Sequence, residues 1–92
     1  MIISWKNKKL QKFFVEKVDK GINIEHRKKL LFLLSILNAV TKPEAMNMIG
    51  YGFHPLTGNR KGFYAVKINA NYRLTFAFDG VNAEQVDYED YH

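Results

Sequence analysis

The stretch GFYAVKINANYRLTFAFDG, residues 62–80, decides the fold, because apolar residues recur along it with a period of two. Two runs within it, residues 62–68 and 72–78, are rich in β-branched and aromatic side chains. Both are therefore predicted to be strands, joined by a tight turn around Asn69 and Ala70. Two adjacent strands joined by so short a turn must be antiparallel.

The second predicted strand has two different faces, because successive side chains alternate across a strand. Arg73 lies on one face, and the opposite face, predicted to form the core, carries Tyr72, Leu74, Phe76 and Phe78. Asp79 and Gly80 then predict a hairpin turn into a third strand over residues 82–88. The carboxyl-terminal half of the chain is thus expected to be an antiparallel meander.

The amino-terminal half is predicted to be mainly helical. Residues 1–5 are expected to form a short strand, and residues 7–21 an amphipathic helix ended by a glycine. Asn23 is a plausible N-cap for a second, leucine-rich helix. Residues 41–44, TKPE, fit a capping box before a short third turn of helix. The whole predicts one α+β domain over residues 1–92, with the helices packed on one face of the sheet.

Composition narrows the class of protein. A chain of 92 residues makes one domain, and 47% hydrophobic residues can supply one core. The absence of cysteine excludes disulfides and thiolate metal sites. The first residues lack the pattern of a signal peptide, and no apolar run reaches the length of a membrane span. We therefore expect a cytoplasmic protein with no membrane association.

The charge is unevenly distributed along the chain. Residues 1–29 hold nine Lys and Arg against three acids, a net charge of +6, and residues 30–92 hold five against six, a net charge of −1. A basic half favours a polyanionic partner such as a nucleic acid, since Lys and Arg displace counterions from phosphates. The same residues could also serve only to solvate the outer faces of helices.

Polar chemistry is concentrated in the loop HPLTGNRKG, residues 54–62, and in the terminal stretch YEDYH, residues 88–92. Arg73 could grip a phosphate with both arms of its guanidinium, although a cation on a strand is often only solvent-facing. Candidate phosphate contacts nearby are Arg60, Lys61 and Lys67. If the tail packs beside the loop, His54 and His92 would share one patch with Arg73 and Asp90.

Two imidazoles and a cation suit one reaction in particular. They can deprotonate a ribose 2′-OH, stabilise the crowded phosphate and protonate the leaving 5′-oxygen. A histidine can take or release a proton near neutral pH. The competing metal site, with ligands drawn from His54, Asp87, Glu89, Asp90 and His92, lacks any recognised ligand spacing. No metal or other cofactor is therefore predicted.

Taken together, the loop, the Asn-x-Arg segment at residues 71–73 and the terminal YEDYH resemble the HigB branch of the RelE/ParE toxin superfamily. The similarity covers essentially the whole chain, including the basic stretch SWKNKKLQKFF at residues 4–14. The resemblance implies a small RelE-like fold. It also implies a toxin of a type II toxin–antitoxin pair that cuts mRNA in the ribosomal A site without a metal.

The resemblance assigns roles to individual residues. It implies an active site formed by His54, Asn71, Arg73, Asp90, Tyr91 and His92. Tyr91 would align or stack on a base and Arg73 would hold the strained phosphate, while His54 shares proton transfer with His92 or Asp90. Which group is the base and which the acid stays open. One departure is Thr57, where the family often has lysine, so that a phosphate contact is missing there.

The resemblance also implies partners. These are a helix-turn-helix antitoxin of the HigA type, the ribosome with its 30S A site and rRNA, and mRNA, with operator DNA bound only through the antitoxin complex. Candidate rRNA contacts in the basic half are Lys6, Lys8, Lys9, Lys12, Arg27, Lys28 and Lys29. The alternatives are a ParE-like inhibitor of DNA gyrase, which shares the fold but has no use for paired imidazoles, and an inactive ribosome-binding or RNA-binding relative.

Overall fold

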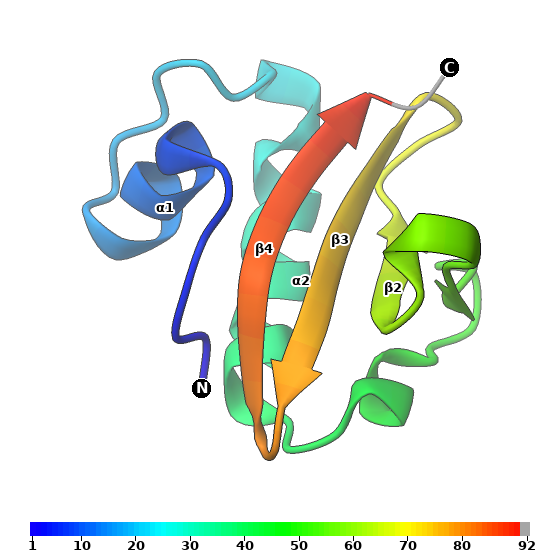
Figure 1. The fold of residues 1–92 in the computed structure, drawn as a ribbon. Helices are drawn as coiled ribbons and strands as arrows, with labels where there is room; N and C mark the ends of the chain where they lie inside the picture. Colours follow the sequence, from blue (N-terminus) through cyan, green and yellow to red (C-terminus); the bar gives the residue numbers. More distant parts are fainter. Residues whose placement is uncertain (91–92) are drawn as a thin grey trace.

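The computed structural model describes residues 1–90, and within them one antiparallel sheet carries the architecture (Figure 1). Its strands, in the spatial order β1-β2-β3-β4, are β1 (His54–Pro55), β2 (Phe63–Lys67), β3 (Tyr72–Asp79) and β4 (Asn82–Asp90). The predicted meander and the α+β class are confirmed. The β3–β4 turn contains Gly80 with a φ of 62°, a backbone conformation that glycine adopts without strain.

The two faces of the sheet differ as the alternation predicted. On the face toward the helices, Val66 pairs with Leu74, which pairs with Tyr88. Val66 and Leu74 are fully buried. The opposite face, here called the outer face, is defined by Ala65, Lys67, Arg73, Thr75, Asp87 and Glu89. Arg73 therefore lies on the face away from the core, as predicted.

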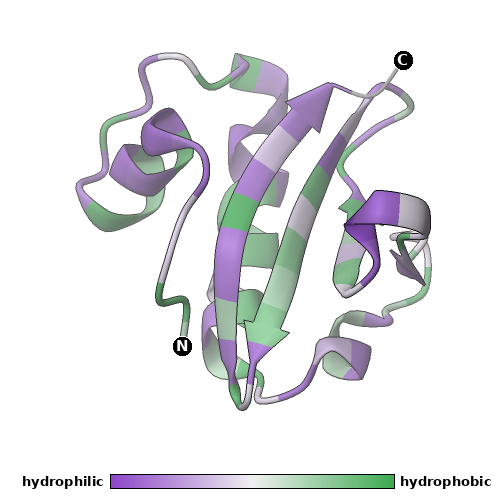
Figure 2. Cartoon of the chain, in the orientation of Figure 1, coloured by the Kyte–Doolittle hydropathy of each residue, from purple (hydrophilic) through white to green (hydrophobic). Residues whose placement is uncertain are grey.

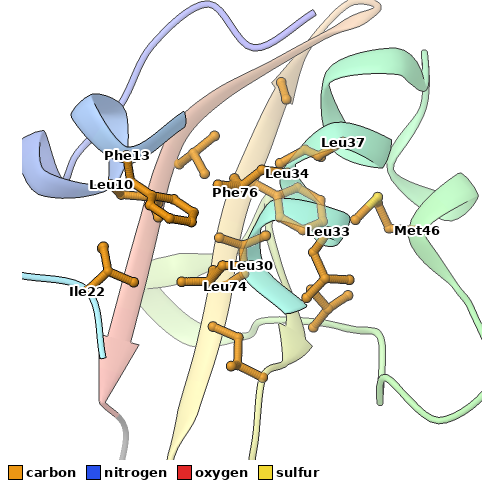
Figure 3. Close-up of a cluster of buried hydrophobic side chains, with 14 residues drawn as sticks. Leu10, Phe13, Ile22, Leu30, Leu33, Leu34, Leu37, Met46, Leu74 and Phe76 are labelled. Atoms are coloured by element: carbon orange, nitrogen blue, oxygen red, sulfur yellow. The ribbon is translucent and has the colours of Figure 1, made fainter. Parts of the chain in front are cut away.

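Two α-helices, α1 (Lys8–Val15) and α2 (Arg27–Ala39), supply the rest of the core. Figure 1 shows α2 running behind β3 and β4, with α1 beside it. Apolar side chains from both helices and from β3 meet in one cluster (Figure 3), which includes Leu10, Phe13, Leu30, Leu33, Leu34, Leu37, Leu74 and Phe76. Burying these side chains accounts for the placement of both helices on one face of the sheet.

Both helices are shorter than predicted. The first ends at Val15, because the φ of 62° at Lys17 is incompatible with a right-handed helix. Val15 and Val18 are exposed, so a further helical turn would gain no free energy from burying these side chains. Asn23 accepts from the backbone N–H of Glu25 and caps a short 3₁₀ helix, η1 (Ile24–His26), which precedes α2. Asn23 is therefore an N-cap, as predicted, but it caps η1 and not the leucine-rich helix α2.

Two further predictions need correction. The expected first strand is only two isolated bridges, in which Ile2 and Trp5 pair in parallel with Ala83 and Val86 of β4. An irregularity in β4 between these bridges prevents a continuous ladder. The short third helix exists as η2 (Pro43–Met46), but its N-cap is Lys42 and makes no side-chain capping bond, so the predicted capping box does not form.

The irregularity in β4 is a β-bulge. Thr75 pairs with Asp87 but Ala77 pairs with Glu84, so β4 holds one extra residue there, and Gln85 has a φ of 52°. As a result Ala83 and Val86, three positions apart, are both fully buried. The bulge resets the alternation, so that Asp87 and Glu89 reach the outer face beside Arg73.

Polar residues gather where the outer face meets a short 3₁₀ helix, η3 (Gly58–Arg60). Figure 2 shows hydrophilic residues in η3 and along the carboxyl-terminal half of β4, with the more hydrophobic stretch of β3 between them. In the part of the chain that the structure describes, no helix has the length and apolar character needed to cross a membrane.

Candidate active site

One carboxylate, near the carboxyl-terminal end of β4, connects the charged residues of the outer face. Glu89 Oε1 accepts from Arg60 Nη1 at 3.0 Å and from Arg73 Nη2 at 3.2 Å, and Glu89 Oε2 accepts from Arg60 Nη2 at 2.5 Å. Thr75 Oγ1 donates to the same Oε2 at 2.7 Å. Three segments distant in sequence, η3, β3 and β4, thus meet at one side chain.

Glu89 is ionised at neutral pH. Its pKa is lowered to about 2, chiefly by the hydrogen bond from Arg60. Burial opposes this shift, and the hydrogen bonds from Thr75 and Arg73 lower the pKa further. The same hydrogen bond raises the pKa of Arg60. Glu89 and Arg73 each expose 17% of their side chains, so this ion pair is partly shielded from water. The arrangement is a preformed, mostly cationic cluster suited to an anion.

Other cations border this cluster. Lys67 is exposed and lies directly opposite Arg73 in the β2–β3 ladder. Lys6 and Arg60 both lie over the ring of Phe63, with Nζ and Cζ at 5.4 and 5.7 Å from its centroid. Lys61 is exposed at the end of η3, next to Arg60. The structure thus brings Arg60, Lys67 and Arg73 together, as the sequence suggested.

His54 is on the same face of the sheet. In β1 it pairs with Ala65, one of the residues that define the outer face, and its side chain is exposed. His54 Nδ1 lies 2.9 Å from the carbonyl oxygen of Gly52. A carbonyl can only accept, so Nδ1 carries the hydrogen and Nε2 is the nitrogen whose lone pair can take a proton. This geometry suits a general base.

The tail residues are placed differently. The register pairs Asp90 with Tyr72, on the helix side of the sheet and opposite to Arg73. Strand alternation thus separates Asp90 from the outer-face cluster instead of placing it within that cluster. Tyr91 and His92, also predicted to act in catalysis, lie outside the described residues. Asn71 is exposed in the turn before β3, two residues from Arg73, and its backbone N–H donates to Asn69.

The basic residues of the amino-terminal half differ in their surroundings. Arg27 pairs with Asp19 at 3.1 Å, and Lys29 donates to the carbonyl oxygen of Ile68 at 2.7 Å. These two residues therefore have structural roles already. Lys8, Lys9 and Lys12 lie on α1 and are exposed, and so is Lys28 on α2. The side chain of Lys9 packs against Gly21. A Cβ atom added at Gly21 would lie 2.5 Å from Cδ of Lys9, so the Lys9 side chain would have to move.

A buried histidine cluster was not predicted from the sequence. His26 is 3% exposed and lies between Tyr88 and Asn69. Asn69 Oδ1 accepts from the backbone N–H groups of Asn71 and Tyr72, both at 2.8 Å, so its amide nitrogen faces His26 Nε2 at 2.7 Å. His26 Nε2 is therefore an acceptor, and Nδ1 donates to the Tyr88 hydroxyl oxygen. The cluster anchors the end of β4 on the helix side.

Thr75 and Glu89 were missed as members of the site. Glu89 was considered from the sequence only as a metal ligand. Within residues 1–90, no three His, Asp or Glu side chains are grouped in a way that could hold a metal ion. The signal that could have identified Glu89 is its spacing from Val86 and Tyr88. If those two side chains face the core, Glu89 must face outward with Arg73.

Comparison with known proteins gives a family and a relative that match nearly the whole chain. Residues 3–92 match the model of the HigB-like toxin family, described as the RelE-like toxin of the type II toxin–antitoxin system HigB. A relative from Proteus vulgaris, Endoribonuclease HigB, is 34% identical over 92 residues, which is the full length of both chains.

Proposed function

Because the chain belongs to the HigB-like toxin family of RelE-like toxins, we propose that it is an endoribonuclease that cleaves mRNA in the ribosomal A site. The observation that supports this most directly is the outer-face cluster, in which Arg73 from β3 and Arg60 from η3 meet at Glu89, with His54 on the same face of the sheet. A phosphodiester carries the charge that such a cluster binds. The Proteus vulgaris relative bears the name of an endoribonuclease.

The proposed reaction needs no metal. The ribose 2′-oxygen attacks the adjacent phosphorus, the O2′–P bond forms and the P–O5′ bond breaks, leaving a 2′,3′-cyclic phosphate and a 5′-hydroxyl. A base takes the 2′ proton and an acid delivers a proton to O5′. His54 Nε2 can serve in one of these roles. His92 is the candidate for the other, because Asp90, the alternative that the sequence suggested, pairs with Tyr72 on the opposite face of the sheet. Arg73 holds the phosphate and stabilises the charge that builds up in the transition state.

The remaining site residues would bind the substrate. Arg60 shares Glu89 with Arg73, and Lys67 lies opposite Arg73 in the β2–β3 ladder. These two residues, together with Lys61 and Asn71, would contact the RNA backbone or a base. Tyr91 would align a base beside the scissile bond. The exposed lysines of α1 and α2 would contact rRNA, whose phosphates attract them at low salt.

The partners follow from the family. As a toxin of a type II system, the protein has an antitoxin partner. We propose that this antitoxin is of the helix-turn-helix HigA type and that only the complex binds operator DNA. Dependence on the ribosome would place the protein in the cytoplasm.

Primer extension on a translated mRNA, with and without ribosomes, tests the proposed function. The wild type should produce cuts only with ribosomes, and Arg73→Ala should lower the rate about 10²–10³-fold, as expected for loss of one donor to the transition state. Lys42→Ala, which removes a cation outside the outer face, is the matched control and should cleave normally. If the wild type makes no cut but inhibits DNA gyrase, the ParE-like alternative is correct. Ribosome binding without cleavage would indicate an inactive relative.

A further inference from the structure

Glu89 joins two cations that would otherwise repel each other. Arg60 Nη1 and Arg73 Nη2 both donate to the single oxygen Oε1, at 3.0 and 3.2 Å, and Arg73 Nε lies 3.4 Å from it. Two guanidinium groups so close together need an anion between them. Glu89 supplies that anion from the neighbouring strand, and Thr75, fully buried beneath it, holds its second oxygen.

Arg60 depends on this carboxylate for its position. It comes from η3, a 3₁₀ helix of three residues. Gly58, which begins η3, and Gly62, two residues after its end, have φ values of 67° and 99°. Arg60 makes two hydrogen bonds to Glu89 and a cation–π contact with Phe63. The fork-shaped pairing with Glu89 is what directs this loop cation toward Arg73 on the sheet.

We propose that Glu89 is a positioning residue for RNA cleavage, which holds Arg60 beside Arg73 so that one phosphate meets both guanidinium groups. This inference rests on the proposed function. Glu89 does not act as the base, because all the hydrogen bonds that it accepts favour its ionised form. It acts through the two arginines, and the β4 bulge is what brings it to their face.

The test compares two variants that change the net charge equally. Glu89→Gln removes the carboxylate but keeps its shape, and Glu84→Gln removes one from the same strand, at the position opposite Ala77. Glu89→Gln should lower kcat for ribosome-bound mRNA about 10²-fold, the effect expected when a catalytic group is displaced by about 1 Å, with KM close to that of Glu84→Gln. Glu89→Asp, which retains the charge, should recover part of the loss.

A second measurement does not depend on cleavage. The Arg73 Nε–H signal in nitrogen-15 NMR should exchange at the same rate in the wild type and in Glu84→Gln, and measurably faster in Glu89→Gln. If the wild type cleaves nothing in any assay, the proposed function fails, while the NMR comparison still decides whether Glu89 orders Arg73.

Two results would overturn the inference. One is that Glu89→Gln cleaves mRNA at the same rate as Glu84→Gln. The other is that Glu89→Gln binds RNA more tightly and cleaves it faster, which would show that the Glu89 carboxylate competes with the substrate phosphate for the arginines. If Glu89→Gln does not fold, Arg60→Lys replaces it, because Arg60 is 32% exposed on a surface turn. Arg60→Lys keeps the charge but loses the two-point pairing, and a wild-type kcat in this variant would equally refute the role of the pair.

Discussion

Lowering the pH should destabilise the protein through Glu89. The pKa of this carboxyl is lowered from 4.5 to about 2 in the folded protein, which corresponds to about 3 kcal/mol of folding free energy at neutral pH. Because the folded value is the lower one, the contribution is complete above the unfolded pKa of 4.5 and is lost as the pH falls toward 2. At pH 3 about 2 kcal/mol of it should be gone.

Urea unfolding followed by the fluorescence of Trp5, the single tryptophan, measures this contribution. At pH 7 Glu89→Gln should unfold with a free energy about 3 kcal/mol below that of the wild type, and the two should converge as the pH approaches 2. Glu84→Gln should keep the wild-type dependence on pH. Parallel curves for the wild type and Glu89→Gln between pH 5 and 2 would refute the reasoning, because the other carboxyl groups are common to both proteins.

Other features of the fold give three further predictions. In thermal unfolding, Gln85→Gly should leave the free energy of unfolding unchanged or raise it by up to about 1 kcal/mol, whereas Gln85→Val should lower it by about 1–2 kcal/mol, since the φ of 52° suits glycine and not a β-branched residue. His26→Phe should lower the free energy of urea unfolding by about 2–4 kcal/mol, because it keeps the ring but leaves the Asn69 amide and the Tyr88 hydroxyl without their partner. Lys8→Glu with Lys12→Glu should flatten the plot of log affinity for ribosomes against log salt by about two, with an unchanged circular dichroism spectrum, and an unchanged slope would exclude α1 from the interface.

The strands were predictable because apolar side chains that face the core alternate with side chains on the other face, and this gives the sequence a period of two. Leu74 and Phe76 face the helices, and Arg73 lies on the other face, as the pattern requires. The helix ends were less predictable. Val18 continues the apolar spacing of α1 in the sequence, but the chain has already turned at Lys17 and leaves Val18 largely exposed. The spacing reports where a helix could bury a side chain, and not whether a neighbouring surface is there to cover it.

The site was predictable only in part, and the reason is the bulge. One inserted residue has no compositional signature, so plain alternation from Ala83 would place Glu89 on the core side and leave Arg73 without this carboxylate. Counted back from Val86 and Tyr88, the same alternation gives the observed faces, and it also places Asp90 on the side of Tyr72. The loop composition indicated that Arg60 could be a phosphate contact. The direction of its side chain, however, depends on Glu89, which lies 29 positions away in the sequence.

The end of β4 is held from both faces at adjacent residues. Tyr88 contacts His26 on the helix side, and Glu89 binds Arg60 and Arg73 on the outer face. The bulge determines this division, since it sets which residue faces which way. In the proposed mechanism, the contacts of Tyr88 and Glu89 therefore serve both stability and catalysis. A change that shifts β4 by one residue would exchange the faces of these two residues. It would place the Glu89 carboxylate in the aromatic cluster and the Tyr88 phenol among the arginines. Deletion of Gln85, which would remove the bulge, should lose folding and cleavage together, whereas Arg73→Ala should lose cleavage with a smaller effect on folding.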